Sequence, residues 1–443
     1  MVSADRDGTS LRIDVLDVIR GVAILLIFFF NIPDMGNSNY EHFGATQLLG
    51  WRPVDQACWW FLTVFIEGTQ RGLLQILFGT GALILLRKTL ASDGPVEPVD
   101  QYFRRNLWLM VFGLFDIFGL LWFGDILLAY AIAAIFLIPF RRLSPKTLLA
   151  VSLLFSAQSV ISGSISYQKQ LQVYHVAVHA MEKQANHVEL SGDDRSALMA
   201  HENGIAVLHP SPTALKEERD ARFGTVPAYV QWFHSIWLKY LWEGGGLKAQ
   251  IVSSFFTMLL GMSLFKLGIV QGERTRRFYT WLALVCYIPG LVERTFSDWQ
   301  HVAFSGLPNV ETAFGEPARL LVTVGHIALI NLVMKTNMGR ALLAPFRAPG
   351  RTAFTLYLMQ NFLGDWILFP GFAFGLWGRY GWFGLTAIGL LVITAQLIVS
   401  NLWLRRFSMG PLEWLWRSLL YQRSLPIRYL PGNSKSLRQQ TGL

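Results

Sequence analysis

Long apolar stretches recur along this chain of 443 residues and constrain its fold more than any other feature. A stretch of about 18 residues is long enough to cross the hydrocarbon core of a bilayer as a helix. With 52% hydrophobic and only 15% charged residues, the chain has too few charges to cover a soluble globule of this size. We therefore expect an all-α, polytopic transmembrane helix bundle. About ten spans are expected, at residues 13–31, 69–87, 106–123, 126–140, 147–165, 249–270, 278–294, 317–335, 353–371 and 381–403.

Positive residues gather in every second connection between these stretches. Arg6 and Arg12 precede the first stretch, and Arg405 and Arg406 follow the last. Because Lys and Arg accumulate on the cytoplasmic side of membrane proteins, we expect both termini in the cytoplasm. The formal net charge of +9 thus comes mainly from Lys and Arg at the ends of apolar stretches, where they fix orientation, so no nucleic-acid partner is expected.

The simplest division of the chain has four parts. These are a first membrane half at 1–165 with an interfacial segment at 34–68, a polar extracytoplasmic insert at 166–246, a second membrane half at 247–403 and a basic cytoplasmic tail at 404–443. The interfacial segment contains several tryptophans, whose amphipathic rings suit the membrane surface. Within the insert, the sequence predicts an exposed helix over 170–190 and a loop over 191–225.

No metal site is expected. Cys58 and Cys286 lie in different apolar surroundings without the spacing of metal ligands. His175 and His179 are four residues apart and would share one helix face, but no third ligand accompanies them. A solvated helix face explains this pair better than a metal does.

Two charged residues, Asp17 and Arg20, lie inside the first apolar stretch. An ionised side chain near the bilayer centre costs roughly 2.5–3.5 kcal/mol and usually faces a cavity filled with water or ligand. Asn31 lies about 16 Å from Arg20 along the same helix axis, and His42 follows in a turn beyond the helix. A cation there suits an anionic donor, an amide suits positioning, and an imidazole can act as a general base. We therefore expect this helix to line a site.

Five motifs resemble those of the YeiB family of bacterial inner-membrane proteins, catalogued as domain of unknown function 418. They occur in family order between residue 11 and about residue 423. The motifs are Leu16-Asp17-Val18-Ile19-Arg20-Gly21-Val22-Ala23-Ile24-Leu25-Leu26, Asn31-Ile32-Pro33, Glu67-Gly68 followed by Leu77-Phe78-Gly79-Thr80-Gly81, Gly124-Asp125-Ile126-Leu127-Leu128-Ala129-Tyr130, and Gly410-Pro411-Leu412-Glu413-Trp414-Leu415-Trp416-Arg417-Ser418.

That family looks related to a superfamily of transmembrane acyltransferases, which includes the acyltransferase-3 proteins and heparan-alpha-glucosaminide N-acetyltransferase. In the acyltransferase-3 pattern the catalytic histidine stands eleven residues after the arginine, where this chain has Asn31. The lysosomal enzyme is similar to this chain in having asparagine there, with its histidine eleven residues further on, where His42 stands. The resemblance thus implies that His42 is catalytic and that Asn31 orients the reacting groups. Many family members carry a histidine where this chain has Ile117, so the adjacent Asp116 would take that catalytic place.

The resemblance also implies the substrates. An acyl-CoA or acetyl-CoA donor would bind from the cytoplasmic side, and a hydroxyl or amine on a glycan, lipid or other small molecule would accept the acyl group outside. Arg351 suits the donor phosphates, because a guanidinium binds phosphate oxygens in pairs. The residues expected to bind substrate or donor are Arg20, Asp17, Glu67, Arg71, Asp125 and Arg351. The expected location is the bacterial inner membrane. The sequence leaves open whether the chain forms a homodimer.

Two other functions remain open at this point. A transporter or exporter of a small amphiphile would use the buried charges as a translocation path. The sequence contains no evident inverted repeat, so the transporter is less favoured than the acyltransferase. A structural membrane protein would instead use the insert at 166–246 to dock a partner.

Overall fold

The described residues are mainly helical. The computed structural model describes residues 4–42, 44–86, 97–303 and 306–428. No β-strand occurs among them, and only an isolated bridge joins Phe407 to Arg428. The all-α fold expected from the sequence is therefore confirmed for this part of the chain.

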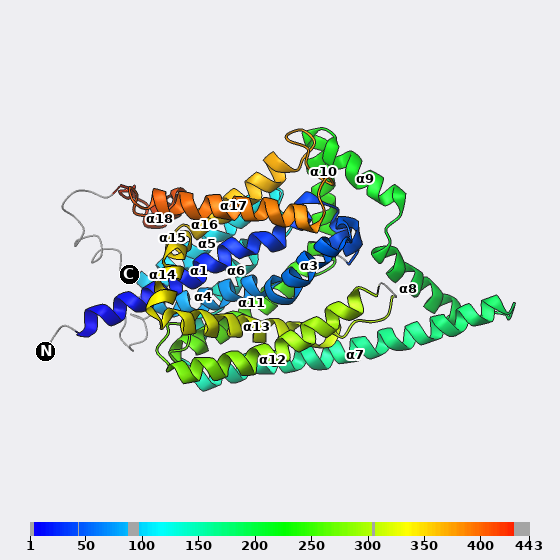
Figure 1. Ribbon diagram of the computed structural model, residues 1–443, viewed down its shortest axis with the longest axis horizontal. Coiled ribbons are helices and arrows are strands. Elements are labelled where there is room, and N and C mark those ends of the chain that lie inside the picture. The colour runs from blue at the N-terminus through cyan, green and yellow to red at the C-terminus, as the bar shows by residue number, and fades with distance from the viewer. Residues whose placement is uncertain (1–3, 43, 87–96, 304–305, 429–443) are drawn as a thin grey trace.

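Figure 1 shows the order of the helices, in which η denotes a short 3-10 or π segment. The first half contains α1 (Ala4–Gly36), α2 (Asn39–His42), η1 (Thr46–Leu49), α3 (Pro53–Phe61), η2 (Leu62–Ile66), α4 (Thr69–Leu86), α5 (Glu97–Phe118), α6 (Leu127–Ile135), η4 (Ile138–Arg142), α7 (Pro145–Ala185), α8 (Gly192–Leu208) and α9 (Pro212–Phe223). The second half contains α10 (Val226–Trp237), η5 (Leu238–Glu243), α11 (Gly246–Lys266), α12 (Arg276–His301), α13 (Glu311–Met334), α14 (Asn337–Leu343), η6 (Ala344–Phe346), α15 (Arg347–Arg351), α16 (Ala353–Phe362), η7 (Leu363–Leu368), α17 (Trp382–Trp403) and α18 (Pro411–Tyr421).

Six helical segments of the described chain are long and apolar enough to cross a membrane. They are Asp14–Gly36 in α1, Pro53–Leu86 through α3, η2 and α4, and the helices α7, α11, α13 and α17. The other four expected spans fall on α5, α6, α12 and the pair α16 and η7, which are shorter or carry more charge. For example, α6 has only nine residues.

The bundle has two ends, which we name by the helices that lie there. The start of α1 lies with α15 and α18 at the α18 end, and α8 to α10 lie at the opposite α8 end (Figure 1). Helix α1 runs between them through the core, where Val18, Ile19, Ala23 and Phe28 are fully buried. It packs against α4, α15, α16 and α17, so a side chain on nearly any of its faces meets another helix.

Glycines allow the closest helix crossings. A Cβ atom on Gly21 would overlap the carbonyl oxygen of Phe346, and one on Gly350 would overlap that of Asp17. Gly79 of α4 and Gly261 of α11 approach each other's helix backbones in the same way. Small residues let membrane helices approach to backbone contact, where van der Waals packing replaces the hydrophobic effect as the attraction.

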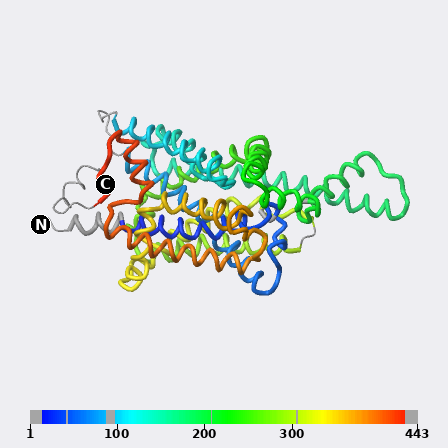
Figure 2. The backbone as a smooth tube through the Cα atoms, turned by 90° about the horizontal axis from the view of Figure 1, so that it is seen from above, coloured from blue at the N-terminus to red at the C-terminus, as the bar shows by residue number. Residues whose placement is uncertain are grey.

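Helix α7 reaches far beyond the bundle. Its 41 residues span about 60 Å, roughly twice the hydrocarbon thickness of a bilayer. Its second half projects at the α8 end and turns back into α8 (Figures 1 and 2). The expected exposed helix at 170–190 is thus the continuation of a helix that begins at Pro145.

The loop expected at 191–225 is wrong, because α8 and α9 occupy most of it. Ser191 Oγ accepts a hydrogen bond from Asp194 N, and the Asp194 carboxylate accepts one from Ser191 N, so a capping box begins α8. Ser211 caps α9, with Pro212 in its first turn. The Pro210-Ser211-Pro212 break is therefore a helix start, in which proline is well tolerated.

A buried ion pair docks the insert onto the bundle. Glu218 and Arg222 of α9 pair at 3.2 Å, and their side chains are only 3% and 6% exposed. Glu218 accepts from Ser38 Oγ at 2.5 Å and from Asn39 N at 2.9 Å. Arg222 donates to the Asn39 side chain at 3.0 Å. We call these four residues the α9 latch, since they fix α9 to the segment after α1.

Candidate functional site

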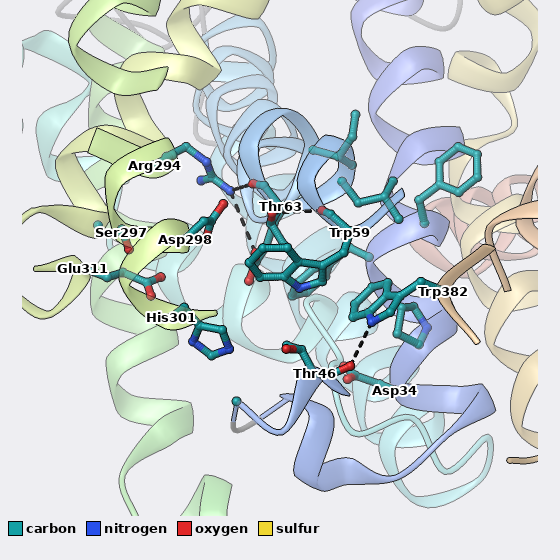
Figure 3. A pocket seen from close by; sticks show the side chains of 18 of the residues that line it. Asp34, Thr46, Trp59, Thr63, Arg294, Ser297, Asp298, His301, Glu311 and Trp382 are labelled. Atoms are coloured by element: carbon teal, nitrogen blue, oxygen red, sulfur yellow. Dashed lines mark hydrogen bonds and ion pairs between the residues drawn. The ribbon is translucent and has the colours of Figure 1, made fainter. Parts of the chain in front are cut away.

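A cavity of about 290 Å³ lies near the α8 end of the bundle. The end of α1, the π segment η2, the second half of α12 and the start of α13 surround it (Figure 3). Its lining residues are Phe29, Phe30, Pro33, Asp34, Gly44, Thr46, Trp59, Leu62, Thr63, Ile66, Glu67, Glu293, Arg294, Ser297, Asp298, His301, Glu311, Gly315 and Trp382.

The π segment shapes one wall of this cavity. Glu67 N donates to Leu62 O at 2.9 Å, which closes a turn one residue wider than an α-turn. Gly68 then takes a positive φ of 68°, which the absence of a Cβ permits. The widened turn leaves the carbonyl oxygen of Thr63 to accept a hydrogen bond from Arg294 of α12, as Figure 3 shows. Such π turns often occur at functional sites.

Acidic groups outnumber basic ones in the cavity. Arg294 lies 4.0 Å from Glu67, a loose ion pair. Both carboxyl oxygens of Glu293 and one of Asp298 are buried without a hydrogen-bond partner among the described residues. Buried carboxyl oxygens are rarely left unsatisfied, because desolvation without a hydrogen bond is costly. The cavity therefore suits a ligand that carries hydrogen-bond donors.

An imidazole lies at the edge of the same space. The ring of His301 stacks on that of Trp59, with centroids 5.9 Å apart and planes at 24°. His301 also lies beside Gly44, where an added Cβ would stand 3.2 Å from its ring. An imidazole can donate or accept a proton near neutral pH, so His301 can serve as an acid or a base for a ligand in the cavity.

The structure brings only part of the expected site to this cavity. Glu67 lines it, whereas Asn31 is buried in α1 between the lining residues Phe30 and Pro33 without lining it itself. His42 is the last residue of α2, and its side chain lies outside the described residues. The neighbouring positions Asp34 and Gly44 line the cavity on either side of it in sequence.

Three expected residues lie at the α18 end instead. Arg20 donates to Asp17 at 2.9 Å and to the Gly350 carbonyl at 3.2 Å. Arg351 donates to the Ser408 carbonyl at 2.9 Å. These three side chains therefore form a separate group, which the structure does not join to Glu67.

Asp116 and Asp125 lie inside the bundle. Asp116 accepts from the Asn361 amide through both carboxyl oxygens, each at 2.9 Å. Asp125 accepts from Leu127 N and Leu128 N at 3.0 and 2.8 Å, and so caps the first turn of α6. The Asp125 carboxylate therefore has a structural role at the start of α6.

Arg71 belongs to a second buried group. Arg319 forms a paired contact with Glu316, at 2.8 Å from Nε and 2.6 Å from a terminal nitrogen. Arg71 lies close enough to interact electrostatically with both, and its buried Nε has no hydrogen-bond partner among the described residues. Glu316 is thus paired with Arg319 and lies in electrostatic range of Arg71.

Sequence reasoning missed most of the cavity. His301 and Asp298 follow the expected end of the span at 278–294, and Glu311 precedes the span at 317–335. A usable signal was the cluster Glu293, Arg294 and Asp298, in which three charges recur within two turns of a helix otherwise rich in apolar residues.

Among the residues that the structure describes, no three His, Cys, Asp or Glu side chains gather as metal ligands would. His179 instead lies 3.4 Å from Glu182 on the exposed surface of α7. The pair His175 and His179 therefore has no third ligand in the described chain.

Comparison with known proteins gives full-length relatives. The family model "Protein of unknown function (DUF418)" matches residues 264–423. The chain is 32% identical over 441 residues to the uncharacterized protein YxaH of Bacillus subtilis (strain 168), covering 95% of this chain and 96% of the relative. It is 26% identical to the uncharacterized protein YeiB of Escherichia coli (strain K12), covering 93% and 97%. No solved structure gives a significant match.

Proposed function

The chain belongs to the DUF418 family together with YxaH and YeiB, and we propose that it is an integral membrane acyltransferase. It would move an acyl group from cytoplasmic acyl-CoA, or acetyl-CoA, to a hydroxyl or amine acceptor at the extracytoplasmic face. In this proposal the chain crosses the bacterial inner membrane about ten times, with both termini and the α18 end in the cytoplasm. The basic residues near that end support the orientation.

The cavity near the α8 end carries the proposal. It offers unsatisfied carboxyl oxygens for the donor hydrogens of an acceptor, beside an imidazole stacked on Trp59. Gly44, two residues after His42 in sequence, is a lining residue. This arrangement supports a role for His42 as general base, with His301 as a second imidazole at the same cavity.

The chemical step is transfer of an acyl group from sulfur to oxygen or nitrogen. His42 removes the proton of the acceptor as its oxygen or nitrogen attacks the thioester carbon. The carbon–sulfur bond breaks, and the proton passes from the imidazolium to the departing thiolate, which leaves as CoA thiol. Asn31 would orient the thioester carbonyl or the imidazole, and Asp116 would assist as a second catalytic group.

The donor is assigned to the α18 end. Arg20, held by Asp17, and the exposed Arg351 would bind its phosphates there. Glu67, Arg71 and Asp125 would line the path between the two ends. Membrane lipids surround the bundle, and a second copy of the chain stays a proposed partner.

A transporter of an anionic amphiphile is the second candidate. The observation that favours it is the group of Arg71, Arg319 and Glu316, because charged side chains inside a membrane bundle often mark a translocation path. A transporter would leave the thioester intact and move its substrate across the membrane.

Acyl-CoA consumption by the purified full-length protein tests the two candidates. The protein is placed in lipid nanodiscs with radiolabelled acetyl-CoA, or longer acyl-CoAs, and an extract of cell-envelope acceptors. We predict label transfer that falls roughly 10²–10⁴-fold in His42→Ala, as for loss of a general base. His179→Ala is the matched control, since His179 is an exposed histidine on α7.

The outcomes separate the proposals. Equal transfer by His42→Ala and His179→Ala would remove His42 from the mechanism, and His301→Ala would then be examined in the same assay. No consumption of any thioester, with uptake of an anionic amphiphile by proteoliposomes, would replace the acyltransferase by the transporter.

A further inference from the structure

Four arginines from four different helices meet at the α18 end. They are Arg20 of α1, Arg105 of α5, Arg351 of α15 and Arg417 of α18. Arg105 lies in electrostatic range of Arg20 and Arg417, and Arg417 in range of Arg20 and Arg351. We call these four residues the arginine cluster.

Packing holds the cluster in place. The guanidinium of Arg105 lies 5.0 Å from the ring centroid of Trp416 and 5.5 Å from that of Phe78. Trp416 Nε1 donates to the carbonyl of Arg105 at 3.2 Å, which ties α18 to α5. Aromatic faces stabilise a partly desolvated guanidinium without neutralising its charge.

A second contact fixes α18 to α16. Glu413 accepts from Phe354 N at 2.7 Å and from Thr355 Oγ1 at 2.5 Å. Both oxygens of its carboxyl are therefore engaged at the start of α16. This contact sets the position of Arg417, one turn further along α18.

The cluster contains more positive than negative charge. Asp17 pairs with Arg20 at 2.9 Å, and the next acidic residue along α1, Asp14, pairs with Arg347 at 3.2 Å. Neither Arg105 nor Arg417 forms an ion pair or a side-chain hydrogen bond within the described part of the chain. Burial lowers the pKa of Arg417, Tyr421 and Glu413 oppose that effect, and Arg20 and Arg351 lower it further.

Like charges held together in a partly buried space repel each other unless an anion joins them. Guanidinium groups match the geometry of phosphate oxygens and bind them through paired hydrogen bonds. Arg351 is exposed, whereas Arg105 and Arg417 are partly buried, so the cluster opens toward solvent and has a packed inner side.

We propose that the arginine cluster binds an organic anion with two or more phosphate charges, and that Arg105 and Arg417 are its inner ligands. Two sources supply this chemistry at a cytoplasmic membrane surface. One is the diphosphate and phosphomonoester of a CoA donor, which rests on the proposed function. The other is the headgroup of an anionic phospholipid, which does not.

The binding of free CoA tests the first source. The full-length protein is placed in nanodiscs of phosphatidylcholine, and CoA is titrated by calorimetry, with inorganic phosphate as a weaker probe. We expect Arg417→Gln and Arg105→Gln to weaken CoA binding about 10- to 100-fold, as for loss of a charge-assisted contact. Arg104→Gln is the matched control, because Arg104 neighbours Arg105 but is exposed and pairs with Asp100.

The second source is tested with lipid. Anionic and zwitterionic lipids that remain bound after purification are quantified by mass spectrometry for the wild type and the same variants. Retention of phosphatidylglycerol or cardiolipin that is lost in Arg417→Gln, without any CoA binding, would support the cluster with a lipid ligand.

The Arg417→Lys variant separates a loss of binding from a loss of folding, and acyl transfer separates this inference from the proposed function. Arg417→Lys keeps the charge without the planar fork, so it should fold as the wild type does and bind more tightly than Arg417→Gln. CoA binding that depends on the cluster, without acyl transfer, would support this inference and overturn the proposed function. Equal CoA binding and equal retention of anionic lipid by the wild type, Arg417→Gln and Arg104→Gln would overturn the inference.

Discussion

At the scale of single residues, glycine decides how α1 and α15 meet. Gly21 and Gly350 stand where an added Cβ would overlap a backbone carbonyl of the opposite helix. A backbone atom cannot move away as the end of a flexible side chain can. The motifs Arg20-Gly21 and Gly350-Arg351 therefore combine a charged side chain with the small residue that lets its helix approach the other.

We predict that Gly21→Ala destabilises the protein by about 1–3 kcal/mol or more, as overpacking does. The control is Gly81→Ala in α4, where a Cβ meets nothing within 4 Å. That variant should be neutral or slightly stabilising, because alanine favours a helix over glycine. Heating each variant in detergent and measuring the monodisperse fraction by fluorescence-detected chromatography compares them. A Gly21→Ala protein as heat-resistant as Gly81→Ala would contradict the packing argument.

Sequence reasoning identified polar residues in apolar stretches but not where their side chains lie. Glu67 lines the cavity, whereas Arg20 is held by Asp17 and Gly350 at the α18 end. The position of a residue along a helix follows from the rise per residue, but its neighbours depend on how helices are rotated and crossed. His301 meets Gly44 only because α12 packs beside the segment after α1, and no local pattern indicates that contact.

At the scale of helices, the α9 latch decides whether the insert stays on the bundle. Its ion pair is almost wholly buried, so removing one partner leaves an uncompensated charge. Such a loss typically costs about 3–5 kcal/mol. Glu218 and Arg222 also hold Ser38 and Asn39 in place, and these two residues follow the end of α1 that lines the cavity.

We predict that Arg222→Gln releases α9 from the bundle while the membrane helices stay folded. Hydrogen exchange should rise by orders of magnitude in 212–223 and rise little in α11 and α13. Arg219→Gln is the control, since Arg219 lies on the exposed side of the same helix. Unchanged exchange in α9 of Arg222→Gln would show that other contacts hold the insert.

The sequence predicted helices best where apolar stretches are long. Each of the ten expected spans overlaps helical residues, and six helical segments are long and apolar enough to cross a membrane, where a helix is the way to satisfy backbone polar groups. Outside the long apolar stretches that constraint is absent, and the sequence predicts a loop where α8 and α9 occur. Their serine caps were visible, but their mixed polar faces contain no apolar periodicity that marks a helix.

At the scale of the whole molecule, the two ends differ in chemistry. Arginines gather at the α18 end, and carboxylates at the cavity near the α8 end. The basic connections in the sequence indicate the arginine-rich end alone, because charge near span ends is a local property. The cavity itself could not be predicted, since segments from α1 to α17 that are distant in sequence enclose it.

We predict that the insert faces outward and the C-terminal region inward. In a variant with Cys58 and Cys286 replaced by serine, a membrane-impermeant maleimide should label Glu189→Cys in intact cells but not Ser424→Cys. Both positions are exposed, so burial does not decide the result. Labelling of Ser424→Cys before lysis would reverse the proposed orientation.

The contact between Arg20 and the Gly350 carbonyl joins positions 330 residues apart. At ribosomal rates of about 5–20 residues per second, α15 emerges roughly 20 to 70 s after the first helix. During that interval the glycine face of α1 is uncovered, and Arg20 lacks its contact with the Gly350 carbonyl. The first helix must therefore remain without this partner until about four fifths of the protein has been made. Assembly of the core is completed from the carboxyl end, and a chain interrupted before residue 346 retains an unseated first helix.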